Sequence, residues 1–559
     1  MQGAALNRRA FLELTGTFTL AASLREWLLA QADTGPVVEI RSGRIRGVIQ
    51  DGVRVFRGIP YGGDTSGANR FLPARAPQPW TGVRDATAFG PRAFQPFRPM
   101  IPEIGDALTG SGPMSEDCLR LNVWTSSTGT GRRPVMVWFH GGGQRTGSGD
   151  SIFYDGQALA RQHDVVVVTT THRLNAFAHL WLAGLPRVSS MFADTANLGL
   201  RDLVLALEWV RDNISQFGGD PGSVTIFGQS GGGGKTAMLT AFPAAKGLFH
   251  RAIIMSTLAD TAVTGLAPER AAEAAELLLA RLGIPATQAE RLQSIPADQI
   301  VAALTGGGVA GGQAGQSGPA QDISLRYVPV VDGTTLPAHP FEPASALSAD
   351  IPILTGSNEC EGIPYGNPDD PYWTSEPTSD VELRDRVTQM LRIGSADAAR
   401  VIALYRAGRP RDSAGDLAAV IAGDASILRQ ASYTIAARKF AQRRAPVYLY
   451  SFNWRSPVRG GKLRCMHCME LPFVFDHPDR IQFMTGSGRD RYGLAKNMSA
   501  AWVAFARTGN PNHSGIPRWD PWNPERWPTM VFNTETRAVN DPWGDERRLL
   551  VALQERGNP

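Results

Sequence analysis

The chain has 559 residues, 43% of them hydrophobic and 19% charged. These proportions are those of a globular protein and exclude a disordered, a collagen-like and a membrane-embedded chain. The 56 Lys and Arg residues exceed the 52 Asp and Glu residues by only four and are scattered, so the sequence carries no electrostatic footprint for nucleic acid. The length is about three to four times that of a typical domain, which allows either several domains or one large α/β unit.

The amino-terminal segment resembles a twin-arginine export signal. Arg8 and Arg9 precede an apolar stretch, and small residues at 30–32 form a cleavage pattern. Charged residues end the apolar stretch below the about 20 residues that a membrane span requires, and no later window is long and apolar enough for one. We expect residues 1–32 to be a signal peptide and residues 33–559 to be exported to the bacterial periplasm or the medium. A membrane anchor or a first structural helix is the alternative interpretation.

Short β-rich runs alternate with helical patterns along the chain. Buried strands are indicated at 135–139, 165–170 and 224–227, where β-branched and aromatic residues dominate. Between them, residues 200–216 carry apolar side chains at helical spacing. This alternation predicts a mostly parallel sheet with helices on both faces. Residues 306–319, rich in Gly with Ala, Gln and Ser, are expected to form a surface loop.

The sharpest local signal is Gly-Gln-Ser-Gly-Gly at 228–232, between the strand at 224–227 and a predicted helix. This is the G-x-S-x-G pattern of a nucleophile elbow, a tight strand-to-helix turn that presents the hydroxyl of Ser230. A phosphate-binding P-loop ending at Lys235 would need glycine where Gln229 stands, so that spacing fails. A glycine-rich turn with an inert serine is the structural interpretation of the pattern taken alone.

Three further segments favour the nucleophile. The strand at 135–139 opens into His-Gly-Gly-Gly at 140–143, whose backbone N–H groups have no Cβ obstruction and suit an oxyanion. Glu361 follows a β-rich run at 351–355, and His467 lies further along the chain. The order serine, acid, histidine is that of the α/β hydrolases.

Over nearly all of residues 37–550 the chain resembles the type B carboxylesterase and cholinesterase-like family of α/β hydrolases, in particular its bacterial para-nitrobenzyl-esterase-like members. The landmarks are Phe-Arg-Gly-Ile-Pro-Tyr at 56–61, Ser-Glu-Asp-Cys-Leu-Arg-Leu-Asn-Val at 115–123, Phe-Gly-Gly-Asp-Pro at 217–221, and Trp502 with residues 505–512. The resemblance implies an α/β-hydrolase fold, with a mostly parallel central sheet, helices on both faces and long insertions that form a gorge. It also implies that residues 33–559 are a single domain.

The resemblance also implies the roles of individual residues. Ser230 is the nucleophile, His467 the general base and Glu361 the acid that orients the imidazole, because a serine hydroxyl needs a base within reach and the base needs a partner. The oxyanion hole is expected from the N–H groups of Gly142, Gly143 and Gly231. The reaction is acylation of the serine with release of the alcohol, then hydrolysis of the acyl-enzyme, with no cofactor and no metal.

Neighbouring residues compete for these roles or support them. Glu359 stands two residues before Glu361, but the family places its acid immediately before a glycine, which favours Glu361. His477 is the rival base, and His140 is expected to be structural. Ser256 matches a family position that supports the acid and is expected to act behind the catalytic residues.

The chain departs from the family pattern at three positions. Gln229 and Gly231 flank the serine where the family often has Glu and Ala, and the loss of a negative charge disfavours a choline-like cationic substrate. Ala93 stands where the family often has the cysteine that pairs with the one at Cys118. We therefore expect Cys118 to be a free, buried thiol.

The other three cysteines lie beside the expected catalytic residues. Cys360 precedes Glu361, and Cys465 and Cys468 bracket His467. Because Glu361 and His467 must touch, their loops should lie close enough for Cys360 to bond with either Cys465 or Cys468, in keeping with an oxidising compartment. A metal site built on Cys465 and Cys468 is the alternative, but it lacks two further matched ligands.

The sequence therefore predicts an exported serine carboxylesterase that acts on small, mainly uncharged esters. An amide, carbamate or polyester hydrolase with the same catalytic residues is the nearest alternative, and a non-catalytic cholinesterase-like binding module is a more distant one. The expected partner is the ester substrate alone, with no nucleic acid and no membrane span. The protein is expected to be a monomer or a weak homo-oligomer.

Overall fold

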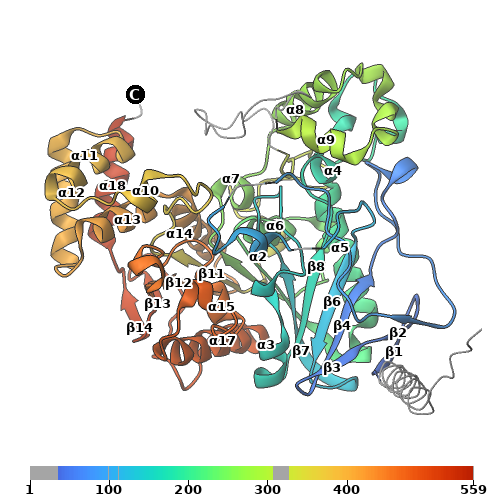
Figure 1. The fold of residues 1–559 in the computed structure, drawn as a ribbon, viewed down its shortest axis with the longest axis horizontal. Helices are drawn as coiled ribbons and strands as arrows, with labels where there is room; N and C mark the ends of the chain where they lie inside the picture. Colours follow the sequence, from blue (N-terminus) through green and yellow to red (C-terminus); the bar gives the residue numbers. More distant parts are fainter. Residues whose placement is uncertain (1–34, 98–99, 111, 306–326, 558–559) are drawn as a thin grey trace, which may run out of the picture.

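The computed structural model describes residues 35–97, 100–110, 112–305 and 327–557, and an 11-stranded mixed sheet forms its centre (Figure 1). In spatial order its strands are β14 (Arg537–Asn540), β13 (Pro528–Phe532), β12 (Val447–Phe452), β11 (Ile353–Asn358), β10 (Arg251–Met255), β9 (Phe217–Gln229), β7 (Gly129–Phe139), β8 (Val166–Thr171), β6 (Arg120–Thr125), β4 (Val53–Pro60) and β3 (Val48–Gln50). All neighbouring pairs from β13 to β8 are parallel, and the pairs at both edges are antiparallel. The mostly parallel sheet expected from the sequence is confirmed.

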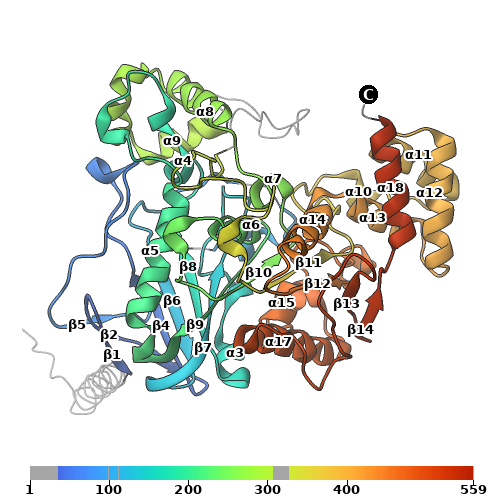
Figure 2. The ribbon, with the colours of Figure 1, turned by 180° about the vertical axis from the view of Figure 1, so that it is seen from behind.

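Helices cover both faces of this sheet, as Figures 1 and 2 show from opposite sides. One face carries α3 (Gln157–His163), α15 (Leu471–Val474) and α17 (Asp490–Thr508), and the other carries α5 (Leu198–Asn213), α6 (Gly231–Leu239) and α14 (Ile427–Ala441). The side chains of β7 show why both faces are covered: Met136 and Trp138 join one hydrophobic cluster, whereas Val135 and Val137 join the other. Alternate residues of a strand point to opposite faces, so a continuous apolar run needs cover on both.

Three of the parallel strands deliver the predicted catalytic segments to one edge. Phe139, the last residue of β7, lies opposite Gly228 of β9, and Gly356 of β11 lies opposite Met255 at the end of β10. Because the carboxyl ends of parallel strands share one edge of the sheet, the segments after β7, β9 and β11 emerge close together. These segments carry the glycine loop, the serine elbow and the acid.

Additional helices flank the central sheet. α8 (Pro268–Arg281) and α9 (Ala297–Leu304) pack with Phe71 and Phe177 in a hydrophobic cluster separate from the two on the sheet. A second group, on the opposite side of the molecule in Figure 1, contains α11 (Asp380–Leu391), α12 (Ser395–Gly408), α13 (Ala414–Ala425) and α18 (Gly544–Gly557). Short helices are α2 (Gly105–Thr109), α4 (Asn175–His179), α7 (Ala259–Ala262), α10 (Pro371–Thr374) and α16 (Gln482–Thr485). A small separate sheet contains β1 (Val37–Ile40), β2 (Gly43–Arg46) and β5 (Val83–Asp85).

The predicted elements are confirmed with shifted limits. β7, β8 and β9 correspond to the three predicted strands, although β7 and β9 begin earlier. The helix predicted at 200–216 ends as an α-helix at Asn213 and continues as a short 3-10 turn. The loop predicted at 306–319 and the signal peptide predicted at 1–32 lie outside the described residues. Within the described ranges, no helix is both long and apolar enough to cross a membrane.

Candidate active site

Ser230 occupies a tight turn between β9 and α6. Its backbone has φ 59° and ψ −126°, a conformation that residues other than glycine rarely adopt. Its N–H donates to the carbonyl of Met255 on the neighbouring strand over 2.9 Å. The turn places the serine at the amino terminus of α6, where it lines a cavity of about 410 Å³. This is the geometry of the nucleophile elbow predicted from the sequence.

Glycines allow α6 to lie directly on the end of β7. A Cβ atom at Gly232 would lie 1.9 Å from the carbonyl oxygen of Phe139, and one at Gly231 would lie 2.6 Å from the nitrogen of Gly143. A larger residue at either position would push the elbow away from the glycine loop. The close approach gives a physical reason for Gly231, where the family often has alanine.

The loop after β7 presents backbone donors beside the serine. Gly142 and Gly143 have positive φ values of 96° and 62°, and the carbonyl of Gly142 accepts the N–H of Thr146 over 3.1 Å. Oε1 of Gln95 accepts the N–H of Gly147 over 2.8 Å and so braces the far side of the loop. No hydrogen bond between described residues uses the N–H groups of Gly142 and Gly143, which leaves both donors for a substrate oxygen.

His467 and Glu361 meet in a buried contact. Nδ1 of His467 lies 2.6 Å from Oε2 of Glu361, and neither side chain is more than 1% exposed. The other carboxylate oxygen accepts the N–H of Asn358 over 2.9 Å, and the ring of Tyr365 stacks on the imidazole with centroids 5.2 Å apart. A carboxylate at Nδ1 fixes the imidazole tautomer and leaves Nε2 for proton transfer.

One cavity brings the predicted residues together. Ser230, His467, Gly142 and Gly143 all line it, and Glu361 stands behind His467. Gln229 also lines the cavity, and its Nε2 lies 3.3 Å from each ring nitrogen of His467. The residue that departs from the family pattern therefore contacts the expected base directly.

The rival acid and the rival base have other partners. Oε1 of Glu359 accepts a hydrogen bond from Arg409 over 3.2 Å. His477 is buried with its ring stacked on Phe475 at 5.9 Å, and burial lowers its pKa to about 4. His477 is not among the described residues that line the cavity, whereas His467 is. The geometry thus favours Glu361 and His467, as the sequence did.

Comparisons with known proteins agree with this geometry. The chain matches the carboxylesterase family over residues 34–547. It is 33% identical to para-nitrobenzyl esterase of Bacillus subtilis, over 92% of this chain and 99% of that protein. It is 34% identical to phenmedipham hydrolase of Pseudarthrobacter oxydans, over 90% of this chain and 97% of that protein.

Solved structures give the same result. A carboxylesterase of Geobacillus stearothermophilus superposes with a TM-score of 0.73 at 36% identity, covering 92% of this chain and 99% of that one. An esterase of Clostridium hathewayi, described as able to hydrolyse aliphatic aromatic polyesters, superposes with a TM-score of 0.78 at 32% identity, covering 93% and 99%.

The chain belongs to the carboxylesterase family. It has the α/β-hydrolase fold and is a carboxylic ester hydrolase of the serine esterase family. The resemblance inferred from its motifs is therefore confirmed.

A second carboxyl group of the esterase lies behind the first. Glu470 is fully buried and accepts hydrogen bonds from Oγ of Ser256 at 3.1 Å and from Nδ2 of Asn358 at 2.6 Å. Burial, reinforced by the negative charge of Glu361, raises the pKa of Glu470 to about 7, while His467 opposes the shift. Ser256, expected to support Glu361, thus donates to Glu470 instead, and Asn358 connects the two carboxyl groups.

Four residues of the site were missed in the sequence: Gln95, Asn358, Tyr365 and Glu470. Asn358 and Glu470 each stand three residues from a predicted catalytic residue, so the motifs contained them. Polar residues so close to an acid and a base could have been proposed as their partners. Gln95 and Tyr365 carry no comparable signal, because only the folded loops bring them to the site.

The cysteines of the carboxylesterase are all buried thiols in this structure. Sγ of Cys360 lies 2.9 Å from Sγ of Cys465, whereas Cys468 donates to Oε1 of Gln229 over 3.5 Å. The structure therefore brings Cys360 to the first of its two expected partners. Cys118 is buried as expected, and burial raises the pKa of its thiol.

The pKa of Glu470 predicts a pH-dependent stability. A carboxyl whose pKa is higher in the folded than in the unfolded state favours folding below its unfolded pKa, and that contribution is lost as the pH rises through the folded value, about 7. Glu470→Gln removes this titration and keeps an acceptor for Asn358. We expect the Tm of Glu470→Gln minus the Tm of the unmodified enzyme to increase by a few degrees from about pH 5 to about pH 8. Calorimetry at both pH values measures this difference. A difference that does not change with pH would contradict the raised pKa of Glu470.

Proposed function

We propose that this carboxylesterase hydrolyses esters through an acyl-enzyme on Ser230, with His467 as the general base and Glu361 as the acid that orients it. The observation that carries the proposal is the 2.6 Å contact between His467 and Glu361, beside a serine elbow on the same cavity. An inert serine turn would have no base, whereas here an imidazole of fixed tautomer shares the cavity with the hydroxyl. This chemistry requires neither a metal nor a cofactor.

In the first half-reaction, the oxygen of Ser230 attacks the ester carbonyl carbon while Nε2 of His467 takes the hydroxyl proton. The carbonyl oxygen becomes an oxyanion, and its proposed donors are the N–H groups of Gly142, Gly143 and Gly231. One such donor contributes about 2.7 to 4 kcal/mol at the transition state of serine hydrolases. Collapse of the tetrahedral intermediate breaks the ester bond, and the alcohol leaves with the proton from His467.

The second half-reaction repeats these steps with water. His467 takes a proton from the water molecule, whose oxygen attacks the acyl carbon on Ser230. Collapse returns the proton to the serine oxygen and releases the carboxylic acid. The carboxylate of Glu361 stabilises the imidazolium that forms in each half-reaction.

The acid is tested with two matched substitutions. Glu361→Gln should lower kcat about 10³- to 10⁴-fold, because the amide favours the wrong imidazole tautomer and cannot stabilise the imidazolium. Glu359→Gln should keep most of kcat, because Glu359 is paired with Arg409. Hydrolysis of p-nitrophenyl butyrate measures both variants. Equal losses, or a larger loss in Glu359→Gln, would show that the acid has been assigned wrongly.

The cavity lining favours uncharged esters as substrates. Gln229 supplies no negative charge beside the serine, and apolar side chains such as Leu258 and Leu428 form much of the remaining wall. A cationic alcohol group would therefore lose its hydration and find no carboxylate on the described wall.

Acetylcholine and its uncharged isostere 3,3-dimethylbutyl acetate test this preference. We expect kcat/KM for acetylcholine to be about 5- to 30-fold lower, which corresponds to about 1 to 2 kcal/mol for a cation that loses hydration without a carboxylate partner. A preference for acetylcholine, or equal kcat/KM values for the two esters, would contradict the proposed substrate preference.

Carbamates and polyesters are the second candidate substrates. One relative is named for the hydrolysis of phenmedipham, and one similar structure is described as hydrolysing aliphatic aromatic polyesters. Both chemistries begin with attack on a carbonyl carbon and develop the same oxyanion, so the proposed residues would serve them unchanged. The cavity of about 410 Å³ has room for substrates of drug-like size.

We further propose that the enzyme is exported. The support is the pair Arg8 and Arg9 before an apolar stretch, with small residues at 30–32. Export would place the mature chain in the periplasm or the medium, where disulfide bonds persist. We also propose a monomer or a weak homo-oligomer, in which each chain carries a complete set of the proposed catalytic residues.

A further inference from the structure

Lys235 is a buried amine on the helix that begins after Ser230. Its side chain is 1% exposed, and its Nζ donates to the carbonyl oxygen of His140 over 2.9 Å. Burial lowers the pKa of Lys235 to about 7. Across the described part of the chain, no carboxylate forms an ion pair with it.

Such a group is costly to bury. An ammonium without a carboxylate partner loses its hydration, and a methionine of similar length would fill the space without that loss. Buried polar groups that lower folding stability are expected mainly at functional sites. The carbonyl that Lys235 holds belongs to His140, the residue directly before the glycines at 141–143.

We propose that Lys235 is a positioning residue that fixes the start of the glycine loop relative to Ser230. Its hydrogen bond ties α6, which carries the serine elbow at its start, to the end of β7, which leads into the loop. The N–H groups of Gly142 and Gly143 are thereby held where the oxyanion forms. This inference rests on the proposed function of the glycine loop.

Lys235→Met tests the proposal, with Lys439→Met as the matched control. Lys439 is also buried and donates to two carbonyls, those of Ser348 and Ala349, but these carbonyls precede β11 and do not belong to the glycine loop. Lys235→Met should lower kcat about 10- to 100-fold with KM within about 2-fold, because a displaced donor weakens only the transition state. Lys439→Met should leave kcat unchanged. Lys235→Gln, which keeps an N–H donor, should recover part of the loss.

A trifluoromethyl ketone inhibitor separates positioning from a structural role. The inhibitor forms a tetrahedral hemiketal adduct with the serine, and this adduct carries an oxyanion. The Ki of the inhibitor should therefore rise in Lys235→Met in proportion to the loss of kcat/KM. The Tm of Lys235→Met should not fall, because the substitution replaces a buried amine, whose charged form burial disfavours, with an apolar side chain. Unchanged kcat and Ki would overturn the proposal for Lys235, and a kcat loss of equal size in Lys439→Met would do so too. If the inhibitor fails to bind the unmodified enzyme, the proposed function itself fails.

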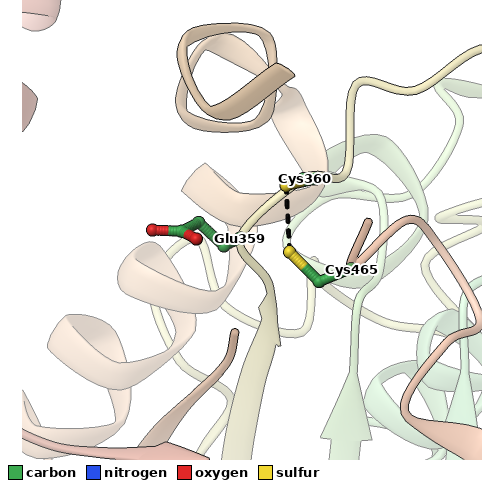
Figure 3. Close-up of side chains that lie close together, drawn as sticks. All are labelled: Glu359, Cys360 and Cys465. Atoms are coloured by element: carbon green, nitrogen blue, oxygen red, sulfur yellow. Dashed lines mark hydrogen bonds between the residues drawn. The ribbon is translucent and has the colours of Figure 1, made fainter. Parts of the chain in front are cut away.

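A second and independent observation concerns Cys360 and Cys465, which join the acid loop to the histidine loop (Figure 3). Their Sγ atoms lie 2.9 Å apart, and both side chains are fully buried. The backbone of Cys360 pairs with that of Met466, and Nδ2 of Asn358 donates to the carbonyl of Met466 over 2.7 Å. Contacts that do not involve sulfur therefore already hold the two thiols together.

A metal ion is the competing occupant of this place. Glu359, Cys360 and Cys465 offer ligand atoms within 4.8 Å of one another. The carboxylate of Glu359 extends away from the sulfur pair in Figure 3 and lies 3.2 Å from Arg409 and 3.9 Å from Arg455. A cation would compete with two guanidinium groups and would find fewer than the about four ligands of a structural zinc site. The geometry thus favours a covalent bond.

The structure assigns a disulfide bond between Cys360 and Cys465, formed by exchange with a disulfide oxidant. Each thiol loses a proton, an S–S bond forms between the two Sγ atoms, and the S–S bond of the oxidant is reduced to two thiols, which balances the two electrons. Burial raises the pKa of the Cys465 thiol, so the exchange should occur during folding, while the loops are still exposed. The finished bond would hold Glu361 against His467.

Mass spectrometry tests the bond in the full chain. The enzyme is unfolded, refolded with oxidised glutathione, and alkylated under denaturing conditions without reductant. We expect two of the four cysteines to be alkylated, and a linked peptide that contains Cys360 and Cys465; reduction should expose all four. Four alkylated cysteines, a link to Cys468, or zinc in the native mass spectrum would each overturn the assignment.

The functional consequence is a difference in heat resistance. The oxidised enzyme should have a Tm a few degrees above that of the reduced enzyme, since the bond closes a long loop in the unfolded chain. Cys360→Ser should abolish this difference, whereas Cys118→Ser should retain it. The comparison between redox states of the unmodified enzyme remains informative even if a serine variant fails to fold. Equal Tm values for the two redox states would contradict the stabilising role.

Discussion

The direct contact between the first turn of α6 and the end of β7 is the constraint on which the site depends. Gly232 allows the helix to rest on the carbonyl of Phe139, and Gly231 brings the elbow against the nitrogen of Gly143. With no side chain between the two segments, a nucleophile on one strand and oxyanion donors on the next face the same small volume. The cost is backbone strain, visible in the positive φ of Ser230.

Buried polar groups surround this contact. Hydrogen bonds compensate the lost hydration of some of these groups more fully than that of others. The backbone N–H of Asn358 donates to Glu361 and its side-chain Nδ2 donates to Glu470, so one residue restrains two carboxyl groups whose negative charges repel each other. Lys235 has a backbone carbonyl as its partner. Buried polar groups of this kind lower the stability of the fold, whereas apolar residues in the same places would not. Their concentration around one cavity fits a site in which the placement of reactive groups takes precedence over folding stability.

Much of this arrangement could be predicted from the sequence, because motifs report local geometry. The pattern around Ser230 predicts a strand-to-helix turn, and the glycines at 141–143 predict exposed N–H groups. Parallel strands then require the segments to meet. The partner of Cys360 could not be chosen, since Cys465 and Cys468 both flank His467 and only side-chain direction distinguishes them.

The contacts of Ser256 show a second reason for the limits of sequence reasoning. Ser256 was expected to support Glu361, but its hydroxyl donates to Glu470. Any support that Ser256 gives to Glu361 therefore passes through Glu470. Packing between distant segments decides such details, as it does for the stacking of Tyr365 on His467. The early start of β9 has the same origin, because its first residues pair with the start of β7.

The elbow, the base and the glycine loop are proposed to act together at one serine, Ser230. Reaction with a fluorophosphonate, followed by peptide mapping, tests this proposal. We expect one adduct per chain, located on Ser230, with loss of esterase activity in proportion to labelling and no adduct in Ser230→Ala. Labelling of another residue, or full activity in enzyme labelled at Ser230, would contradict it.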